Sequence, residues 1–175
     1  GGLWSLGYDW QRDRVDSSTD YARDRRLNRG VFAQWQGTFG AHSLQASARH
    51  DDNQQFGGKS TGSLLWGWEF ASALRLTASA GTAYKAPTFN ELYFPGYGNP
   101  ALRPESSRSY EPGLRGTPGW GQWSLNAFQT RIRDLIAYDA SIGLPGNVER
   151  ARIRGAEAVA STKLADWTLR GTATW

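Results

Sequence analysis

Apolar and polar residues alternate with a period of two along most of this chain, as side chains do on a β-strand. The first segment is typical, because one parity is aromatic or apolar and the other is small or polar: Trp4, Leu6, Tyr8 and Trp10 alternate with Ser5, Gly7, Asp9 and Gln11. The same alternation recurs at residues 30–39, 43–49, 61–70, 74–81 and 167–175. A helical period fits none of these runs, so the sequence predicts antiparallel β-structure.

Three segments are less regular. The apolar parity changes between Ala127 and Phe128, which predicts a β-bulge near residues 127–128. Pro112 stands inside the segment 109–115 and has no N–H to donate. The sequence therefore does not decide how that strand pairs with its neighbours at this position. Residues 148–164 also predict a strand, one parity of which carries Arg150, Arg152 and Arg154.

The connections between these segments are alternately short and long. Tight turns are predicted at residues 40–41, 71–73, 117–119 and 165–166, and longer polar connections at residues 16–27, 52–59, 86–105 and 139–147. In an up-and-down sheet of about nine strands every second connection emerges at the same end, so the tight turns share one end and the long loops the other. Outer-membrane barrels show this asymmetry.

The two parities also differ in chemistry. The polar parity carries charges, which suits a wide, water-filled interior: Asp9, Arg49, Glu69, Arg75, Glu111, Arg115 and Arg170. Every tryptophan except Trp120 lies on the apolar parity, many near strand ends, where indole rings favour the membrane–water boundary. Strands of about 10 to 12 residues match the length that a tilted strand needs to cross a bilayer. The pattern favours a lipid-facing apolar surface over a soluble, lipocalin-type carrier, which would turn that surface inward.

Arg12 and Arg14 continue the apolar parity of the first strand beyond Trp10. Cations are costly in hydrocarbon but suit the headgroup level, where they would meet outer-membrane lipid and the phosphates of lipopolysaccharide. The alternative is that both arginines only keep a loop soluble.

The composition of the chain argues against several classes of function. The 175 residues have a formal net charge of +4, spread along the chain, which does not favour a nucleic-acid partner. Cysteine is absent and there are 2 histidines, so a thiolate or histidine-rich metal site is not expected. No run approaches the roughly 18 apolar residues of a membrane-spanning helix. Methionine is absent too, so we expect a piece of a longer protein, without a signal peptide.

Candidate chemistry is sparse. Five aspartates lie in and near the first long connection and could supply oxygen ligands for calcium: Asp9, Asp13, Asp16, Asp20 and Asp24. They alternate with arginines, which would pair with them instead. No Ser/His/Asp set and no general acid–base pair stands out, so an enzyme is not expected. We therefore expect no catalytic residue, no metal site and no cofactor in this stretch.

Residues 79–116 are the most informative part of the chain. A strand ends at a Lys-Ala-Pro sequence, a loop with several prolines and glycines follows, and a strand restarts after Pro104. Three motifs resemble, in order and spacing, the barrel of TonB-dependent outer-membrane receptors: Lys85-Ala86-Pro87-Thr88-Phe89-Asn90-Glu91-Leu92-Tyr93, Gly98-Asn99-Pro100-Ala101-Leu102-Arg103-Pro104-Glu105, and Tyr110-Glu111 with Gly113. Residues 49–53, 55–57, 134–139 and 151–155 are similar to the cobalamin (vitamin B12) receptor branch, so the resemblance covers essentially the whole chain.

The resemblance implies an antiparallel up-and-down transmembrane β-barrel of about 22 strands, with a plug domain in its lumen, in the outer membrane of a Gram-negative bacterium. Such receptors bind a scarce substrate at the outer face and release it inward when TonB pulls on the plug. Residues 1–175 would be a partial barrel domain of about nine strands, without the plug and the first and last barrel strands. The resemblance implies that TonB acts only through the missing plug, that calcium belongs only to loops of the intact receptor outside this window, and that the fragment alone is inactive.

The long connection after Pro87 holds the candidate ligand-binding residues. Tyr93, Phe94 and Tyr97 offer flat apolar area suited to cobalamin or another large ring ligand. The alternative is that the three rings pack the loop upon itself. The wider alternatives are a siderophore or haem receptor of the same superfamily, a porin without a plug, and a soluble ligand-binding β-barrel.

Overall fold

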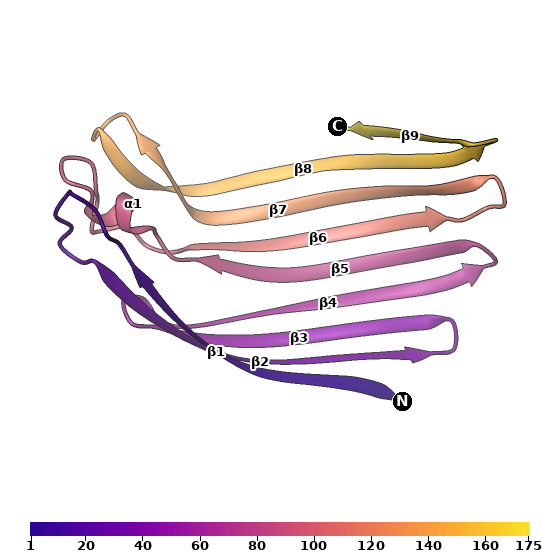
Figure 1. Cartoon of the computed structure of the whole chain (residues 1–175), viewed down its shortest axis with the longest axis horizontal. Helices are drawn as coiled ribbons and strands as arrows, with labels where there is room; N and C mark the ends of the chain where they lie inside the picture. Colours follow the sequence, from indigo (N-terminus) through magenta and orange to yellow (C-terminus); the bar gives the residue numbers. More distant parts are fainter.

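The structure is a computed structural model that describes the backbone of residues 1–175 and every side chain except that of Glu149. Nine antiparallel strands form one sheet, in which each strand pairs with its neighbours in the sequence (Figure 1). They are β1 (Gly2–Arg14), β2 (Arg25–Phe39), β3 (His42–Asn53), β4 (Gly57–Ala71), β5 (Leu74–Lys85), β6 (Glu105–Gly116), β7 (Gly121–Asp139), β8 (Leu144–Leu164) and β9 (Trp167–Thr174). The predicted all-β, up-and-down arrangement is confirmed.

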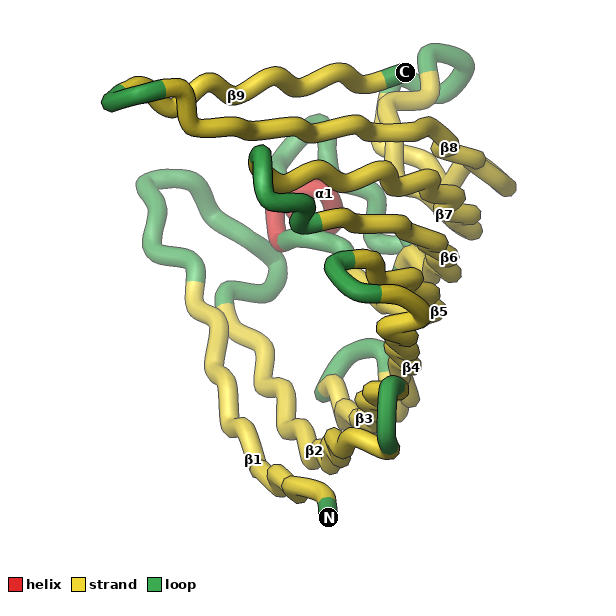
Figure 2. Tube along the Cα trace, turned by 90° about the vertical axis from the view of Figure 1, so that its right-hand side faces the viewer, coloured by secondary structure: helices red, strands yellow, loops and turns green.

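The sheet is strongly curved. Viewed along the strands it forms an arc with a concave and a convex face, and β1 and β9 swing round toward the same side (Figure 2). In the described chain β1 and β9 do not pair with one another, so the arc is open. A wide arc of twisted strands is the shape expected of a segment of a large barrel wall.

The short turns lie together at one end of the sheet, at the right of Figure 1, as the sequence predicts. Three of them contain a residue in the left-handed region, namely Gly40 (φ 58°), Ala73 (φ 63°) and Ala165 (φ 52°). We call this end of the sheet the turn end and the opposite end the loop end.

The loop end differs in part from expectation. Residues 15–24 and 86–104 are long connections, and the second contains the helix α1 (Phe89–Tyr93). The β3–β4 and β7–β8 links are short, at residues 54–56 and 140–143, so the prediction of long connections there is wrong. The flanking strands simply continue further into this polar region. In the described residues no helix is long and apolar enough to cross a membrane.

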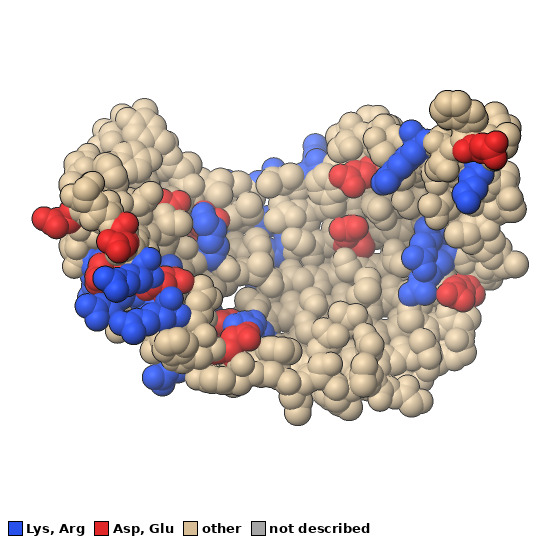
Figure 3. Space-filling view, viewed as in Figure 1, with Lys and Arg blue, Asp and Glu red and all other residues tan. Residues whose placement is uncertain are grey.

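Register and pleat divide the side chains between the two faces. Trp4 pairs with Trp35 on the convex face, where Trp4 is 66% exposed. The concave face, which Figure 3 shows, carries charged side chains of both signs. Among the described side chains, buried apolar residues concentrate in the connection 86–104, which holds Pro87, Phe89, Leu92 and Leu102, and the fully buried Pro145 lies in β8. The sheet thus presents its apolar face outward, as a lipid-facing barrel wall does.

Aromatic rings cluster on the convex face near the turn end. The His42 ring stacks on Trp66 and Trp68, with centroids 5.8 and 5.7 Å apart, and Trp68 packs on Phe70 at 5.5 Å. Aromatic girdles of this kind lie at the membrane–water interface of outer-membrane barrels. The cluster therefore marks one boundary of the lipid-facing band.

The predicted bulge at residues 127–128 is wrong. β7 keeps a single register with β8 through this point, where Phe128 pairs with Gly155. The apolar parity changes there because Phe128 lies on the same face as Asn126, where its ring occupies the space that a side chain at Gly155 would need. A register shift lies instead between β4 and β5, after Trp68 and before Ala71.

Pro112 interrupts one ladder without ending β6. On the β5 side it pairs with Ala78. On the β7 side the ladder skips Glu111 and Pro112 and resumes at Gly113 in the same register. The missing N–H thus falls on the β7 side, and the strands stay aligned across the gap.

Replacing Pro112 with valine in the intact protein is expected to stabilise it, because residue 112 then donates an N–H toward β7. The expected gain in the free energy of unfolding is about 1 kcal/mol, measured by urea unfolding in lipid bilayers. Ser72→Ala, at an exposed turn, is the control and should leave this free energy unchanged. If Pro112→Val matched the unchanged protein, the gap in the ladder would carry no cost.

Candidate ligand-binding surface

The connection between β5 and β6, residues 86–104, is a folded segment that we call the β5–β6 loop. Thr88 caps α1, because its Oγ1 accepts a hydrogen bond from the Glu91 N–H at 3.2 Å and its own N–H donates to Glu91 Oε2 at 2.6 Å. A threonine followed three residues later by a glutamate is the sequence signature of this capping box. The signature could have predicted α1, which an analysis of hydrophobic period alone missed.

The β5–β6 loop has a small apolar core of its own. Leu92 is fully buried, and the side chains of Phe89 and Leu102 are only 8% and 4% exposed. Arg26 reaches this core from β2: its guanidinium lies 5.1 Å from the centroid of the Phe89 ring, and its Nη1 donates to the Pro87 carbonyl at 2.8 Å. A cation–π contact and a hydrogen bond thus fix the loop to the β1–β2 side of the arc.

Asn147 fixes the loop on the opposite side. Its Oδ1 accepts from the Arg103 N–H at 2.8 Å, and its Nδ2 donates to the carbonyls of Arg103 and Asp134 at 2.9 and 2.7 Å. The Arg103 guanidinium also pairs with the Asp134 carboxylate at 2.6 Å. Asn99 adds a hydrogen bond to the Pro145 carbonyl at 2.9 Å. The loop is held from both sides, so the surface that it presents is pre-organised.

Two of the three predicted ligand-binding residues belong to exposed aromatic pairs. Phe94 and Tyr97 are 42% and 40% exposed. Phe94 packs edge-on against Tyr21 of the β1–β2 connection, with centroids 6.2 Å apart, and Tyr97 is parallel to Tyr138 of β7 at 6.5 Å. Sequence reasoning missed Tyr21 and Tyr138, because they come from distant segments. We call these four residues the aromatic surface.

Tyr93, the third predicted residue, has different surroundings. It is half-buried at the end of α1, and its hydroxyl accepts a hydrogen bond from Gln55 Nε2 at 2.5 Å. This contact ties the β5–β6 loop to the β3–β4 turn. Tyr93 therefore supports the loop, while Phe94 and Tyr97 offer open ring area.

An ion-pair network joins β1, β2 and β3 on the concave face at the loop end. Arg49 Nη1 lies 2.5 Å from Asp9 Oδ2, and Arg49 Nε lies 2.7 Å from Asp51 Oδ2. Asn28 Nδ2 donates to Asp51 Oδ1 at 2.8 Å. A side chain at Gly30 would collide with the Arg49 guanidinium and the Asp51 carboxylate, so the network requires glycine there.

Of the five aspartates in and near the first long connection, Asp9, Asp13 and Asp24 pair with arginines, whereas Asp16 and Asp20 form no ion pair with a described side chain. Asp13 lies 3.5 Å from the Arg26 guanidinium, and Asp24 lies 3.3 Å from that of Arg25. The hydrogen bond from Arg25 lowers the pKa of the exposed Asp24 carboxyl. Among the residues whose side chains are described, no three histidine, aspartate or glutamate side chains come together as a metal site.

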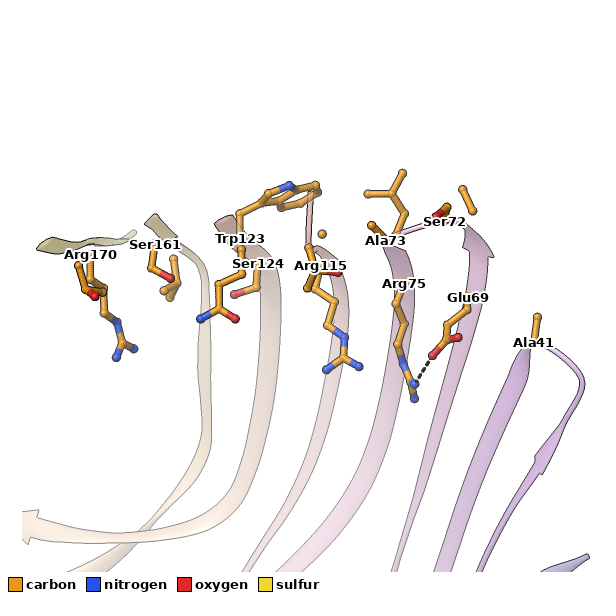
Figure 4. A pocket seen from close by; sticks show the side chains of 17 residues that line it. Ala41, Glu69, Ser72, Ala73, Arg75, Arg115, Trp123, Ser124, Ser161 and Arg170 are labelled. Carbon is orange, nitrogen blue, oxygen red and sulfur yellow. Dashed lines mark hydrogen bonds and ion pairs between the residues drawn. The ribbon is translucent and has the colours of Figure 1, made fainter. Parts of the chain in front are cut away.

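A hollow with a volume of about 1120 Å³ lies on the concave face at the turn end. Arg75 and Arg115 extend into it from the neighbouring strands β5 and β6, and Arg170 extends into it from β9, which β7 and β8 separate from β6 (Figure 4). Arg75 pairs with Glu69 at 3.2 Å. Its titratable lining is three arginines and one glutamate. Such a lining attracts anions but offers no acid–base pair for catalysis at neutral pH.

The family follows from comparison with known proteins. Residues 1–175 match the family described as "TonB dependent receptor-like, beta-barrel". The chain belongs to the TonB-dependent receptors. Membership places this stretch of barrel wall in the outer membrane of a Gram-negative bacterium.

Relatives of this TonB-dependent receptor chain are much longer than the chain. The vitamin B12 transporter BtuB of Photobacterium profundum is 40% identical over 162 residues, which cover 88% of the chain and 27% of BtuB. The siderophore receptor PirA from Pseudomonas aeruginosa has a TM-score of 0.84 at 17% identity, over 99% of the chain and 39% of PirA. A mutant of the ferric enterobactin receptor PfeA from Pseudomonas aeruginosa, in complex with enterobactin, has a TM-score of 0.82 at 20% identity, over 99% of the chain and 33% of PfeA. At these identities the two structures show a shared fold.

Replacing Asn147 with alanine in the intact receptor is expected to loosen the β5–β6 loop, because both hydrogen bonds between Asn147 and Arg103 of the loop are lost. The free energy of local opening should fall by roughly 1–3 kcal/mol, measured by amide hydrogen exchange of residues 99–105. Gln122→Ala, at the turn end, is the control and should leave exchange of the loop unchanged. Unaltered exchange in Asn147→Ala would show that the loop does not depend on this residue.

Proposed function

We propose that this chain is part of the wall of an outer-membrane receptor that imports cobalamin or a related corrinoid and is energised by TonB. The observation that carries the proposal is the 40% identity over 162 residues to a vitamin B12 transporter. The identities of 17% and 20% to PirA and PfeA are far lower. The proposed activity is binding and transport, with no catalysis by this chain.

The nine strands would be a partial barrel domain that other strands of the receptor complete. An open arc leaves the outer edges of β1 and β9 without partners, and unpaired backbone groups are not tolerated in hydrocarbon. We therefore infer that the chain is inactive alone. A plug held in the lumen would contact the concave face, and TonB would act through that plug.

The aromatic surface is the proposed contact for the ligand. Phe94, Tyr97 and Tyr138 present exposed rings at the loop end, where a substrate arrives from outside, and the half-buried Tyr21 packs against Phe94. Flat aromatic area suits a large, rigid ring system, because it buries much surface at little cost in side-chain entropy. Tyr93 would act by holding the loop in place.

The exposed Arg12 and Arg14 are proposed to meet lipid headgroups and the phosphates of lipopolysaccharide at the loop end of β1. The alternative function is import of a siderophore or haem. The fold shared with PirA and PfeA shows a common scaffold, and this scaffold is the support for the alternative. On a common scaffold the loops decide which substrate is bound.

Titration of the intact receptor with cyanocobalamin is expected to give saturable binding in detergent, followed by intrinsic tryptophan fluorescence. Ferric enterobactin and haem, titrated in the same way, should bind at least about a hundredfold more weakly, as expected when a rigid site fits one ring system. Saturable binding of a ferric siderophore with no response to cyanocobalamin would replace the first proposal by the alternative.

The combined change Phe94→Ala and Tyr97→Ala is expected to weaken cyanocobalamin binding by about tenfold to a hundredfold, the effect of losing two aromatic contacts. Trp120→Ala removes an exposed ring at the turn end, far from the loop, and should leave binding unchanged. Tyr93→Phe removes only the hydrogen bond to Gln55 and should have a smaller effect. If the folded, membrane-inserted double variant bound cyanocobalamin normally, the aromatic surface would not be the ligand contact.

A further inference from the structure

Six arginines lie together on the convex face at the loop end, and we call them the arginine cluster: Arg108, Arg131, Arg133, Arg150, Arg152 and Arg154. The register places Arg108 beside Arg131 and Arg131 beside Arg152, in a row across β6, β7 and β8. The next row toward the loops pairs Arg133 with Arg150. The cluster therefore covers adjacent positions of three strands.

The cluster lies on the same face as the lipid-facing residues. Along β7 its members have the parity of Trp123 and Leu125, and along β6 Arg108 has the parity of Leu114. No register shift separates these positions from the cluster. The pleat thus turns all six guanidinium groups away from the lumen.

None of the six arginines forms an ion pair with a described carboxylate. The positions beside the cluster on β5 and β6 are uncharged, namely Thr82, Tyr84 and Ser106. The carboxylates of Glu105 and Asp134 line one hollow with Arg108, Arg131 and Arg133, but they pair with Lys85 and Arg103 instead. Like charges directly opposite one another destabilise a sheet, so the arrangement costs stability unless an anion lies between the strands.

The height of the cluster along the strands indicates where that anion would lie. Trp123 marks the turn end of the apolar band, and Arg131 follows eight residues later, about 26 Å along the tilted strand. The outward-facing apolar band of such barrels is about 25 Å tall. A strand tilted by about 40° rises by only about three quarters of its length, so the row of Arg131 lies roughly 20 Å up, near the outer boundary of the band. Arg154, opposite Gln129, lies one row nearer the centre of the band. Long arginine side chains extend from such positions to the headgroups.

We propose that the arginine cluster is a binding site for the phosphate groups of a phosphorylated glycolipid of the outer leaflet, whose acyl chains lie along the apolar band below. Guanidinium groups bind phosphate through paired hydrogen bonds, and two rows of them can hold more than one phosphate. The site is separate from Arg12 and Arg14 of β1. The inference rests on the membrane placement in the proposed function and does not depend on which substrate is imported.

The test compares purified intact receptor with the double variant Arg131→Gln and Arg152→Gln, titrated with bis-phosphorylated lipid A in mixed detergent micelles. The variant is expected to bind lipid A about tenfold or more weakly, because two charge-assisted contacts are lost. Lipid A without phosphates should bind weakly and equally to both proteins. In lipid-free detergent the variant should be at least as heat-stable as the unchanged receptor, because repulsion between opposite arginines is relieved.

Arg115→Gln combined with Arg170→Gln makes the same change in charge on the concave face and should leave lipid A binding unchanged. Three outcomes would each overturn the proposal. The first is an equal loss of lipid A binding in this control, and the second is equally tight binding of lipid A without phosphates. The third is full displacement of lipid A by an equal concentration of inorganic phosphate. Cyanocobalamin binding, measured on the same samples, should not respond to the arginine variants. Its absence in all samples would overturn the proposed substrate and leave the lipid site standing.

Discussion

The hydrogen-bond ladder between neighbouring strands is the constraint on which this structure depends. In a bilayer no water can replace a missing partner, so each backbone N–H and C=O must be satisfied by the strand beside it. The long registers between neighbouring strands follow from this requirement, with one shift between β4 and β5 near the turn end. Pro112 is tolerated because it breaks the ladder on one side only and leaves the alignment of β6 and β7 unchanged.

The same ladder makes the fold readable from sequence. A period of two fixes which residues share a face, so alternation was sufficient to predict the strands, the two chemistries of the sheet and the tight turns. Prediction failed at residues 52–59 and 139–147, where strands continue beyond the apolar band. Polar residues face both sides there, so polarity no longer distinguishes strand from loop. It also failed at Phe128, because a ring that fills the space over a glycine looks like a slip of register.

The candidate site was predictable only where its residues are neighbours in sequence. Tyr93, Phe94 and Tyr97 stand out in one loop, but nothing local indicates that Tyr21 and Tyr138 lie beside them. The arginine cluster shows the same limit. The parity of Arg150, Arg152 and Arg154 is visible in the sequence, whereas their partners on β6 and β7 depend on the register. Contacts between strands thus need the three-dimensional structure.

The unequal connections at the two ends of the sheet have a consequence for biogenesis. A barrel that enters the membrane from the periplasm must carry its loop end through the hydrocarbon, while the tight turns stay behind. Residues 15–24 then bring several ionised side chains across, each of which is expensive at the bilayer centre. The rate of insertion should accordingly be limited by translocation of these charges. Cells gain from machinery that thins or opens the bilayer for such a chain.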